Sequence, residues 1–368
     1  MSSKFAAFLI STFLFCAAVI AQTGKIDEAI RKKMAEQRIA GTSVAVLRDG
    51  KVVMTKGYGL ANVERSIPAA PETKYQIASA TKPFTATAIM MLVETGKVAL
   101  DEKAAKYLPN LPAQYGEVTI RQLLTQTSGV NRDLRTGNTD DFTIEEFWKR
   151  LATAPASFKP GERWEYSNTG YILLGMVIES VTKTSYGDFL GEHIFKPLGM
   201  KDTAYLEPPD KSNRRAIGYD FVENTFRPSP YFSGGFSAGG LVSTVSDMAK
   251  WDAALNTEKL IKRSSLEQMF MPAKLNDGKP INFDFRGEQS GYGFGWFLTS
   301  YRGRKIATHG GVVSGFSSQI MRFTDDKITI IVNSNGKSGA DRIGYAEGLA
   351  KTVADAYVPN LLPAPANR

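Results

Sequence analysis

The sequence is poor in residues that bind metals and form disulfides. Its 368 residues include a single cysteine, Cys16, and only two histidines, His193 and His309. A zinc site built from His and Cys ligands therefore lacks the residues it needs. Cys16 lies in a segment that we expect to be removed, so a disulfide framework and a cysteine nucleophile are excluded as well. We expect a protein without metal or cofactor that is held together by its apolar core.

Long runs of one charge are also missing. The formal net charge is +8, but the positive residues are scattered, and the longest runs are Arg31-Lys32-Lys33 and Arg214-Arg215. Nucleic-acid binding needs a concentrated basic stripe, so we expect no nucleic-acid partner. Charged residues make up 22% of the chain and aromatic residues 11%, which excludes a disordered chain.

The first 21 residues are typical of a cleavable secretory signal. Lys4 provides the positive start, residues 5–19 form an apolar stretch, and Val19-Ile20-Ala21 is a cleavage site. The stretch is shorter than the ~20 residues that a spanning helix needs, so we expect cleavage after Ala21 and no stable membrane span. The mature protein is then predicted to be secreted or periplasmic. Its oligomeric state stays open.

Strand patterns lie at both ends of the chain. Asp49-Gly50 separates two β-branched runs and predicts a hairpin, because the tight turn needs φ > 0. Near the other end, four strand-like runs follow one another: YGFGWFLTSY, RKIATHGG, GFSSQIMRF and KITIIVNSN. An isolated hairpin is marginal in water, so we expect one antiparallel sheet built from both ends. Helices predicted at Lys25–Ala40 and Asp341–Tyr357 would cover it.

Between these ends, apolar residues at three- and four-residue spacing predict an all-α insert. The expected fold class is therefore α+β, an antiparallel sheet flanked by helices with an inserted helical subdomain. Two segments rich in Pro, Gly, Asn and Ser, 208–240 and 272–292, are predicted as long surface loops. The predicted boundaries are a signal at 1–21, one folded unit at 22–360 and a flexible tail at 361–368. Within the folded unit, the sheet takes residues from about 25–78 and 290–357, and the helical part spans about 79–270.

Ser79 and Lys82 are the first candidates for chemistry. A spacing of three residues on a helix puts the hydroxyl and the amine on one face. Pro83 predicts that the helix begins at about Ser79, where free N–H groups and the positive end of the helix dipole favour developing negative charge. The same spacing recurs at Ser180 and Ser334, but neither serine stands at a helix start.

Two further motifs carry polar groups. Tyr166-Ser167-Asn168 follows a Pro-Gly turn and precedes a predicted helix. In one interpretation Ser167 or Asn168 caps that helix. In the other, Tyr166 shuttles a proton and Asn168 donates to a substrate amide or ester. His309-Gly310-Gly311 ends a strand, and its glycines let a ligand approach the backbone closely. His193 lies on a predicted helix and is interpreted as structural.

In this order, the three motifs resemble those of the serine β-lactamase-like and penicillin-binding superfamily, especially the branch with class C β-lactamases, D-alanyl-D-alanine carboxypeptidases and related esterases. The resemblance covers about residues 25–355 and extends to pieces such as IASATKPFTA, PGERWEYSNTGYILLGMVIE and SAGGLVSTVSDMAKW. It implies that Ser79 forms an acyl-enzyme and that Lys82 and Tyr166 handle the proton. It also implies that His309 takes the place often held by a lysine among the catalytic residues, and that Asn168, Gly310 and Gly311 contact the substrate. It also implies an oxyanion hole from the backbone N–H groups of Ser79 and Val312.

Two positions depart from the family pattern. His309-Gly310-Gly311 stands where Lys-Thr-Gly is common, and a mostly neutral histidine attracts a substrate carboxylate less strongly. This favours ester or peptide substrates, cell-wall peptides included, over β-lactams. Gln126 stands where relatives often carry histidine, a change that we interpret as altered supporting hydrogen bonds.

The expected activity is that of a secreted serine hydrolase acting on an ester or amide, with two alternatives. One is a non-catalytic member of the same fold that binds peptidoglycan or a protein. The other is an α/β-hydrolase that uses Ser237, because residues 235–239 match the G-x-S-x-G pattern. That pattern needs a buried strand before the serine, whereas the segment here is glycine-rich on both sides.

Overall fold

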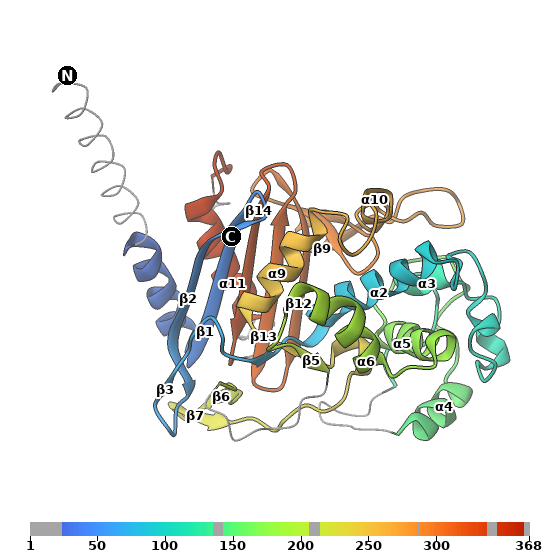
Figure 1. Cartoon of the computed structure of the whole chain (residues 1–368), viewed down its shortest axis with the longest axis horizontal. Helices are drawn as coiled ribbons and strands as arrows, with labels where there is room; N and C mark the ends of the chain where they lie inside the picture. The colour runs from blue at the N-terminus through green and yellow to red at the C-terminus, as the bar shows by residue number, and fades with distance from the viewer. Residues whose placement is uncertain (1–23, 135–142, 206–213, 286, 337–343, 364–368) are drawn as a thin grey trace.

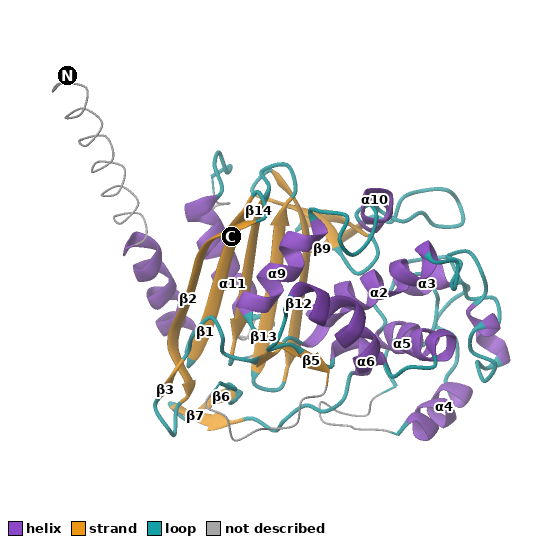
Figure 2. Ribbon diagram, in the orientation of Figure 1, coloured by secondary structure: helices purple, strands orange, loops and turns teal. Residues whose placement is uncertain are grey.

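A nine-stranded antiparallel sheet takes its strands from both ends of the chain (Figures 1 and 2). The structure is a computed structural model that describes residues 24–134, 143–205, 214–285, 287–336 and 344–363. The predicted signal at 1–21 lies outside the described residues. The strands in spatial order are β3 (Ile67–Pro68), β2 (Lys51–Asn62), β1 (Gly41–Arg48), β14 (Ile328–Ser334), β13 (Phe316–Phe323), β12 (Arg304–Val313), β11 (Phe297–Tyr301), β10 (Glu288–Tyr292) and β9 (Phe283–Phe285).

The predicted hairpin joins β1 and β2. Asp49 has φ = +50° and Gly50 has φ = +72°, as a primed two-residue turn requires at both central positions. On its other edge β1 pairs with β14, so the first and last long strands lie side by side near the centre of the sheet. The predicted sheet made from both chain ends is therefore confirmed.

Helices cover both faces of this sheet (Figure 2). On one face, a helix at residues 24–37 and α11 (Tyr345–Tyr357) bury apolar side chains such as Ile30 and Leu349 against Ile330. On the other face, the sheet joins the larger core of the helical part. Burial of each large aliphatic side chain contributes roughly 1.5–3 kcal/mol, so the two cores fix the position of the strands between them.

The middle of the chain forms a largely helical part beside the sheet (Figure 1). Its α-helices are α2 (Lys82–Glu94), α3 (Ile120–Leu124), α4 (Ile144–Thr153), α5 (Asn168–Thr182), α6 (Tyr186–Leu190), α7 (Lys196–Leu198), α8 (Phe236–Gly239), α9 (Val245–Leu255) and α10 (Arg263–Met269). Short 3₁₀ segments are η1 (Ala78–Thr81), η2 (Ala104–Lys106) and η3 (Ala113–Tyr115), and η4 (Gly191–Phe195) is a π-helical segment. Thr119 and Thr143 start α3 and α4 with capping boxes, which explains where these helices begin.

The prediction of an all-α middle was wrong in one respect. A small three-stranded sheet joins β4 (Tyr75–Gln76), β8 (Leu241–Ser243) and β5 (Ala204–Tyr205). These strands have only two or three residues, too few to give an alternating pattern in the sequence. The small sheet ties the segment before η1 to the segment after α8.

The two predicted loops were also partly wrong. Segment 208–240 contains a hairpin of β6 (Tyr219–Val222) and β7 (Thr225–Pro228) as well as α8. Segment 272–292 contains β9 and β10, which extend the main sheet beyond β11. Glycine and polar residues in short edge strands resemble loop composition, and the sequence signal was lost for that reason.

The ends of the folded part differ slightly from expectation. The first helix spans 24–37 rather than 25–40, and α11 begins at Tyr345 while residues 337–343 lie outside the described part. Leu362, in the segment predicted as a flexible tail, donates its backbone N–H to the Arg302 carbonyl at 3.0 Å. The start of that segment therefore lies against the turn between β11 and β12.

Candidate active site

Ser79 lies where η1 runs directly into α2, close to the predicted helix start. Pro83 sits in the first turn of α2, where its missing N–H has no helical partner to lose. Ala78 holds φ = +48°, a region that costs a non-glycine residue about 1–2 kcal/mol. Packing must compensate, and part of it comes from the sheet, because Ser318 of β13 donates its hydroxyl to the Ile77 carbonyl. The sharp turn before Ser79 is thus held by the sheet.

Lys82 is fully buried directly behind Ser79. Its Nζ lies 3.1 Å from Ser79 Oγ, 2.8 Å from Asn168 Oδ1 and 2.8 Å from the Ala238 carbonyl oxygen. A buried ammonium is costly unless its three donors find acceptors, and here three acceptors surround it. The predicted Ser–Lys contact is present. Ala238 was not anticipated from the sequence, because it is 156 residues away along the chain.

The Tyr166-Ser167-Asn168 segment caps a helix, as one of its two interpretations predicted, and it also contributes a side chain to the site around Lys82. Ser167 caps α5, since its hydroxyl accepts the N–H of Gly170 at 3.0 Å. Tyr166 faces the same site as Lys82, whose Nζ lies 4.7 Å from the centre of the phenol ring. One motif therefore starts a helix and places the face of a phenol ring beside Lys82.

Asn168 has a different setting from the one expected. Its Oδ1 accepts from Lys82, so its Nδ2 is the donor that reaches Asp133 Oδ2 at 3.0 Å. Asn168 is not among the residues that line the cavity next to Ser79. The structure thus places Asn168 between Lys82 and Asp133, and Asp133 is a site residue that no sequence motif indicated.

Gln126 forms hydrogen bonds to the backbone on either side of Tyr166. Its Oε1 accepts the backbone N–H of Ser167 at 2.7 Å, and its backbone carbonyl accepts from Glu165 at 2.9 Å. Gln126 itself has φ = +64° in the turn after α3. These two hydrogen bonds fix the backbone on both sides of Tyr166, which agrees with the interpretation of Gln126 as a supporting residue.

His309 is buried in β12 and neutral. Its Nδ1 lies 2.7 Å from the Gly310 carbonyl, which can only accept, so the proton is on Nδ1. Nε2 is then an acceptor, and the Tyr292 hydroxyl lies 3.3 Å from it. Burial and the nearby Lys82 charge lower the pKa of His309 to about 3, while burial keeps the pKa of Tyr292 well above its usual value. The third motif therefore carries no positive charge at neutral pH.

Gly311 brings β12 against the start of η1. A Cβ at this position would lie 2.2 Å from the Ile77 carbonyl oxygen and 2.7 Å from the Ser79 nitrogen, which is closer than any side chain permits. Glycine is therefore required here for close backbone approach. The contact places the predicted oxyanion-hole residues, Ser79 and Val312, on neighbouring segments.

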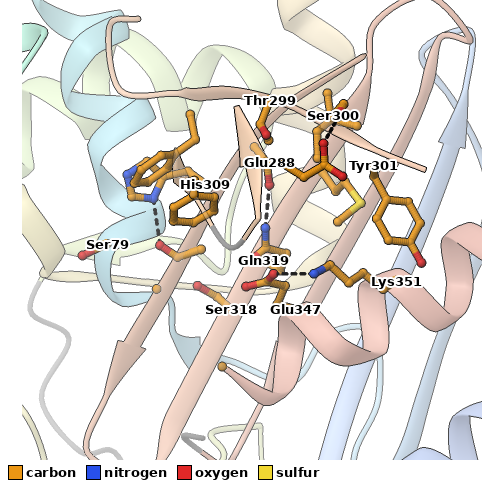
Figure 3. Close-up of a pocket in the computed structure, with 18 of the residues that line it drawn as sticks. Ser79, Glu288, Thr299, Ser300, Tyr301, His309, Ser318, Gln319, Glu347 and Lys351 are labelled. Atoms are coloured by element: carbon orange, nitrogen blue, oxygen red, sulfur yellow. Dashed lines mark hydrogen bonds and ion pairs between the residues drawn. The ribbon is translucent and has the colours of Figure 1, made fainter. Parts of the chain in front are cut away.

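A cavity of about 980 Å³ connects these groups. It is lined by Ser79 and Tyr166 from the helical part and by His309, Gly310, Gly311 and Val312 from β12. Figure 3 shows Ser79 and His309 at one end of this cavity and Tyr301, Glu347 and Lys351 toward the other. The serine, phenol and imidazole predicted from distant parts of the sequence thus share one cavity, and the lysine lies immediately behind the serine.

Other sequence candidates lie elsewhere. Ser237 is fully buried on α8 and donates its hydroxyl to the Tyr171 carbonyl at 2.8 Å, so it faces the core. The alternative α/β-hydrolase site was therefore wrong. Ser180 donates to the Tyr107 carbonyl, and His193 is exposed beside Phe189.

Within the described ranges, no three His, Cys, Asp or Glu side chains gather in a way that would hold a metal ion. Over the same ranges, the helices are too short or too polar to cross a bilayer.

The antiparallel sheet, the largely helical part and the serine at a helix start between them define a protein of the β-lactamase/transpeptidase fold. A beta-lactamase family profile matches residues 26–354. The chain belongs to the beta-lactamase family.

Individual relatives are similar over most of the chain. Protein flp of Staphylococcus aureus (strain MW2) is 32% identical over 321 residues, which is 84% of this chain and 62% of that protein. This chain thus spans less than two thirds of that relative. Among solved structures, the octameric penicillin-binding protein homologue from Pyrococcus abyssi is 32% identical, with a TM-score of 0.78 over 90% of this chain and 76% of its own. The D-amino acid amidase from Ochrobactrum anthropi SV3 is 28% identical, with a TM-score of 0.80 over 91% and 97%.

Proposed function

We propose that this protein is a serine hydrolase that cleaves an ester or amide through an acyl-enzyme on Ser79. The observation that carries the proposal is the 3.1 Å contact between Ser79 Oγ and the buried Lys82 Nζ. A hydroxyl is a weak nucleophile unless a neighbouring base takes its proton. The beta-lactamase family match and the amidase neighbour support hydrolysis as the reaction class.

The contacts of Lys82 fit its use as that base. Asn168 Oδ1 and the Ala238 carbonyl are pure acceptors. Once Lys82 has lost a proton, its neutral amine keeps two N–H donors for them and turns its lone pair toward the Ser79 hydroxyl. After proton transfer, the ammonium donates to all three oxygens. The proton therefore moves without breaking either supporting hydrogen bond, and Asn168 acts by positioning Lys82.

The reaction then follows two balanced steps. Ser79 Oγ bonds to the carbonyl carbon and its proton passes to Lys82. The bond from that carbon to the leaving oxygen or nitrogen then breaks, while Tyr166 relays the proton from Lys82 to the departing alcohol or amine. Water next attacks the acyl-enzyme, gives a proton back to Ser79 and releases the acid. Backbone N–H groups of Ser79 and Val312 are the proposed donors to the oxyanion, supported by the close contact of Gly311 with the Ser79 backbone.

The charge state of His309 narrows the substrate class. A neutral imidazole with both nitrogens engaged offers little attraction to a substrate carboxylate. Esters and amides without a carboxylate at this position are therefore the proposed substrates, ahead of β-lactams. We further propose that the protein works outside the cytoplasm, as the predicted signal at residues 1–21 indicates.

Intact-protein mass spectrometry tests the proposal. The protein is incubated with p-nitrophenyl esters, nitrocefin and a D-Ala-D-Ala peptide, and the expected result is an acyl adduct that is lost in Ser79→Ala and kept in Ser237→Ala. An adduct that survives Ser79→Ala would contradict the mechanism. No adduct and no turnover with the whole panel would favour the non-catalytic binding alternative.

A further inference from the structure

We propose that a row of aromatic side chains beside Ser79 forms a subsite for an aromatic ring of the substrate. The proposal rests on the proposed function, because the ring would be attached to the ester or amide that Ser79 attacks. Besides Tyr301 toward the other end, the same cavity as Ser79 is lined by the aromatic residues Trp164, Tyr166, Phe285 and Phe297. Trp164 and Tyr166 lie in the segment just before α5, and Phe285 and Phe297 lie on β9 and β11 at one edge of the sheet.

Three of these rings form a nearly parallel series. Phe285 of β9 stacks on Phe297 with ring centres 4.5 Å apart and planes at 19°. Phe297 lies parallel to Tyr166 at 6.1 Å and 9°. Both separations are within the range of favourable offset stacking. The series therefore leads from the sheet edge to the phenol that faces Lys82.

Neighbouring groups hold this series in place. Trp164 stacks on Phe283 with centres 3.9 Å apart and planes at 7°, and Phe297 lies 5.2 Å from His309. Rings fixed in this way lose little conformational entropy when a ligand binds, so less of the favourable stacking energy is offset and the affinity is higher. Trp164, Tyr166 and Phe285 are only half-buried. Half-exposed rings that line a cavity offer apolar surface to a small-molecule ligand.

The groups next to Phe297 favour an uncharged ring, although Arg132 also lines the cavity. The imidazole beside Phe297 is neutral, whereas Glu347 and Lys351 lie toward the opposite end in Figure 3. Aromatic rings prefer to pack on other rings in offset or edge-to-face arrangements, and this adds to the gain from burial. The ring can belong to the acyl part or to the leaving group, and the same side chains would contact it in either case.

Matched methyl and benzyl esters distinguish the two positions. Methyl phenylacetate against methyl acetate places the ring in the acyl part, and benzyl acetate against methyl acetate places it in the leaving group. We expect kcat/KM to favour the ring-bearing ester by about tenfold or more in one of these pairs. Phe285→Ala is expected to reduce that ratio several-fold, and Phe285→Leu, which keeps apolar bulk without a ring, to reduce it partly.

Phe226→Ala is the matched control. Phe226 is also half-buried in an aromatic cluster on a hairpin, beside Tyr219 and Phe221, but it does not line the cavity. Its loss should leave the ratio unchanged. Equal kcat/KM values within both ester pairs, or a ratio that Phe285→Ala leaves intact, would overturn the subsite.

A binding measurement separates this inference from the proposed function. Calorimetric titration of the Ser79→Ala variant with phenylacetamide, benzyl acetate and acetamide reports ring binding without turnover. Tighter binding of a ring-bearing ligand than of acetamide, lost in the Ser79→Ala/Phe285→Ala double variant, supports the subsite even if the native protein hydrolyses none of the esters. Equal affinity for all three ligands contradicts it even if the native protein is an active hydrolase.

Discussion

The two walls of the cavity differ in their chemistry. The helical wall holds a lysine whose buried Nζ is surrounded by oxygen atoms, and a carboxylate, Asp133, stands behind it. The sheet wall holds a neutral imidazole, and aromatic rings lie beside it. The groups that can move a proton therefore lie on the helical side, while the sheet side adds apolar rings together with polar residues such as Glu288 and Ser300.

This difference suggests a division of labour. Changes on the helical wall should alter mainly kcat, because they remove groups that move or position a proton. Changes on the sheet wall should alter mainly substrate preference and stability. The predictions below test this division, beginning with the largest expected effect.

The largest effect is expected from Ser79→Ala on the helical wall. Loss of the nucleophile should lower kcat by at least ~10⁴-fold, as is usual when a covalent catalytic group is removed. Steady-state kinetics with an activated ester measures the change. Ser237→Ala is the matched control, since it removes a core hydroxyl and should keep turnover while unfolding becomes easier by about 1 kcal/mol. Turnover that depends on Ser237 instead would reverse the assignment.

Lys82→Met should lower kcat by roughly 10²–10⁴-fold, the usual range for a lost general base. KM should change less, because Lys82 lies behind Ser79 and does not line the cavity. Lys183→Met is a suitable control, since Lys183 belongs to the second Ser-x-x-Lys match and ends α5. A large rise in KM with constant kcat would show that Lys82 binds substrate rather than activating Ser79.

Asp133→Asn should lower kcat by about tenfold. The carboxylate accepts from Asn168 Nδ2, and a charged acceptor strengthens such a hydrogen bond by about 1 kcal/mol or more. Asn168 would then hold Lys82 less firmly. Steady-state kinetics of the variant and the native protein gives the changes in kcat and in KM separately. A change confined to KM would assign Asp133 to substrate binding.

The smallest effect on turnover is expected from His309→Gln on the sheet wall, but this variant should change the pH dependence of stability. The pKa of His309 is about 3 in the folded protein and near 6.5 when unfolded. Between these values only the unfolded state binds the proton, so stability is lost as pH falls. The native protein should lose about 1.4 kcal/mol per pH unit more than the variant between pH 6 and 4. Urea unfolding at pH 7 and pH 5 measures this difference. An equal loss of unfolding free energy in the native protein and in the variant would contradict a buried neutral His309.

The parts of the fold and of the site that were predictable from sequence depend on local geometry. Ser79 and Lys82 are three residues apart at a helix start, and Asp49-Gly50 specifies its turn by backbone angles alone. Tyr166 was found because it stands next to a helix cap. In each of these cases, neighbouring residues determine where the side chain lies.

The parts that were missed depend on contacts between distant segments. Ala238 and Asp133 meet the site only through tertiary packing, and Tyr292 reaches His309 from the boundary between a predicted loop and a predicted strand. Asn168 was identified as a substrate contact, which stays a prediction, but its contacts with Lys82 and Asp133 were missed because its spacing from Tyr166 reveals neither. Long-range partners of this kind carry no signal in the spacing of one sequence.

The pairing of β1 with β14 also affects how the chain folds during synthesis. Thr42 donates its hydroxyl to the carbonyl of Asn333, 291 residues further along. At about 5–20 residues per second, on the order of 15–60 s pass between the emergence of these two residues from a ribosome. For that time one edge of β1, a strand almost entirely buried in the finished sheet, has no partner. Such an edge invites pairing with other chains, so the nascent protein depends on staying apart from its copies until translation ends.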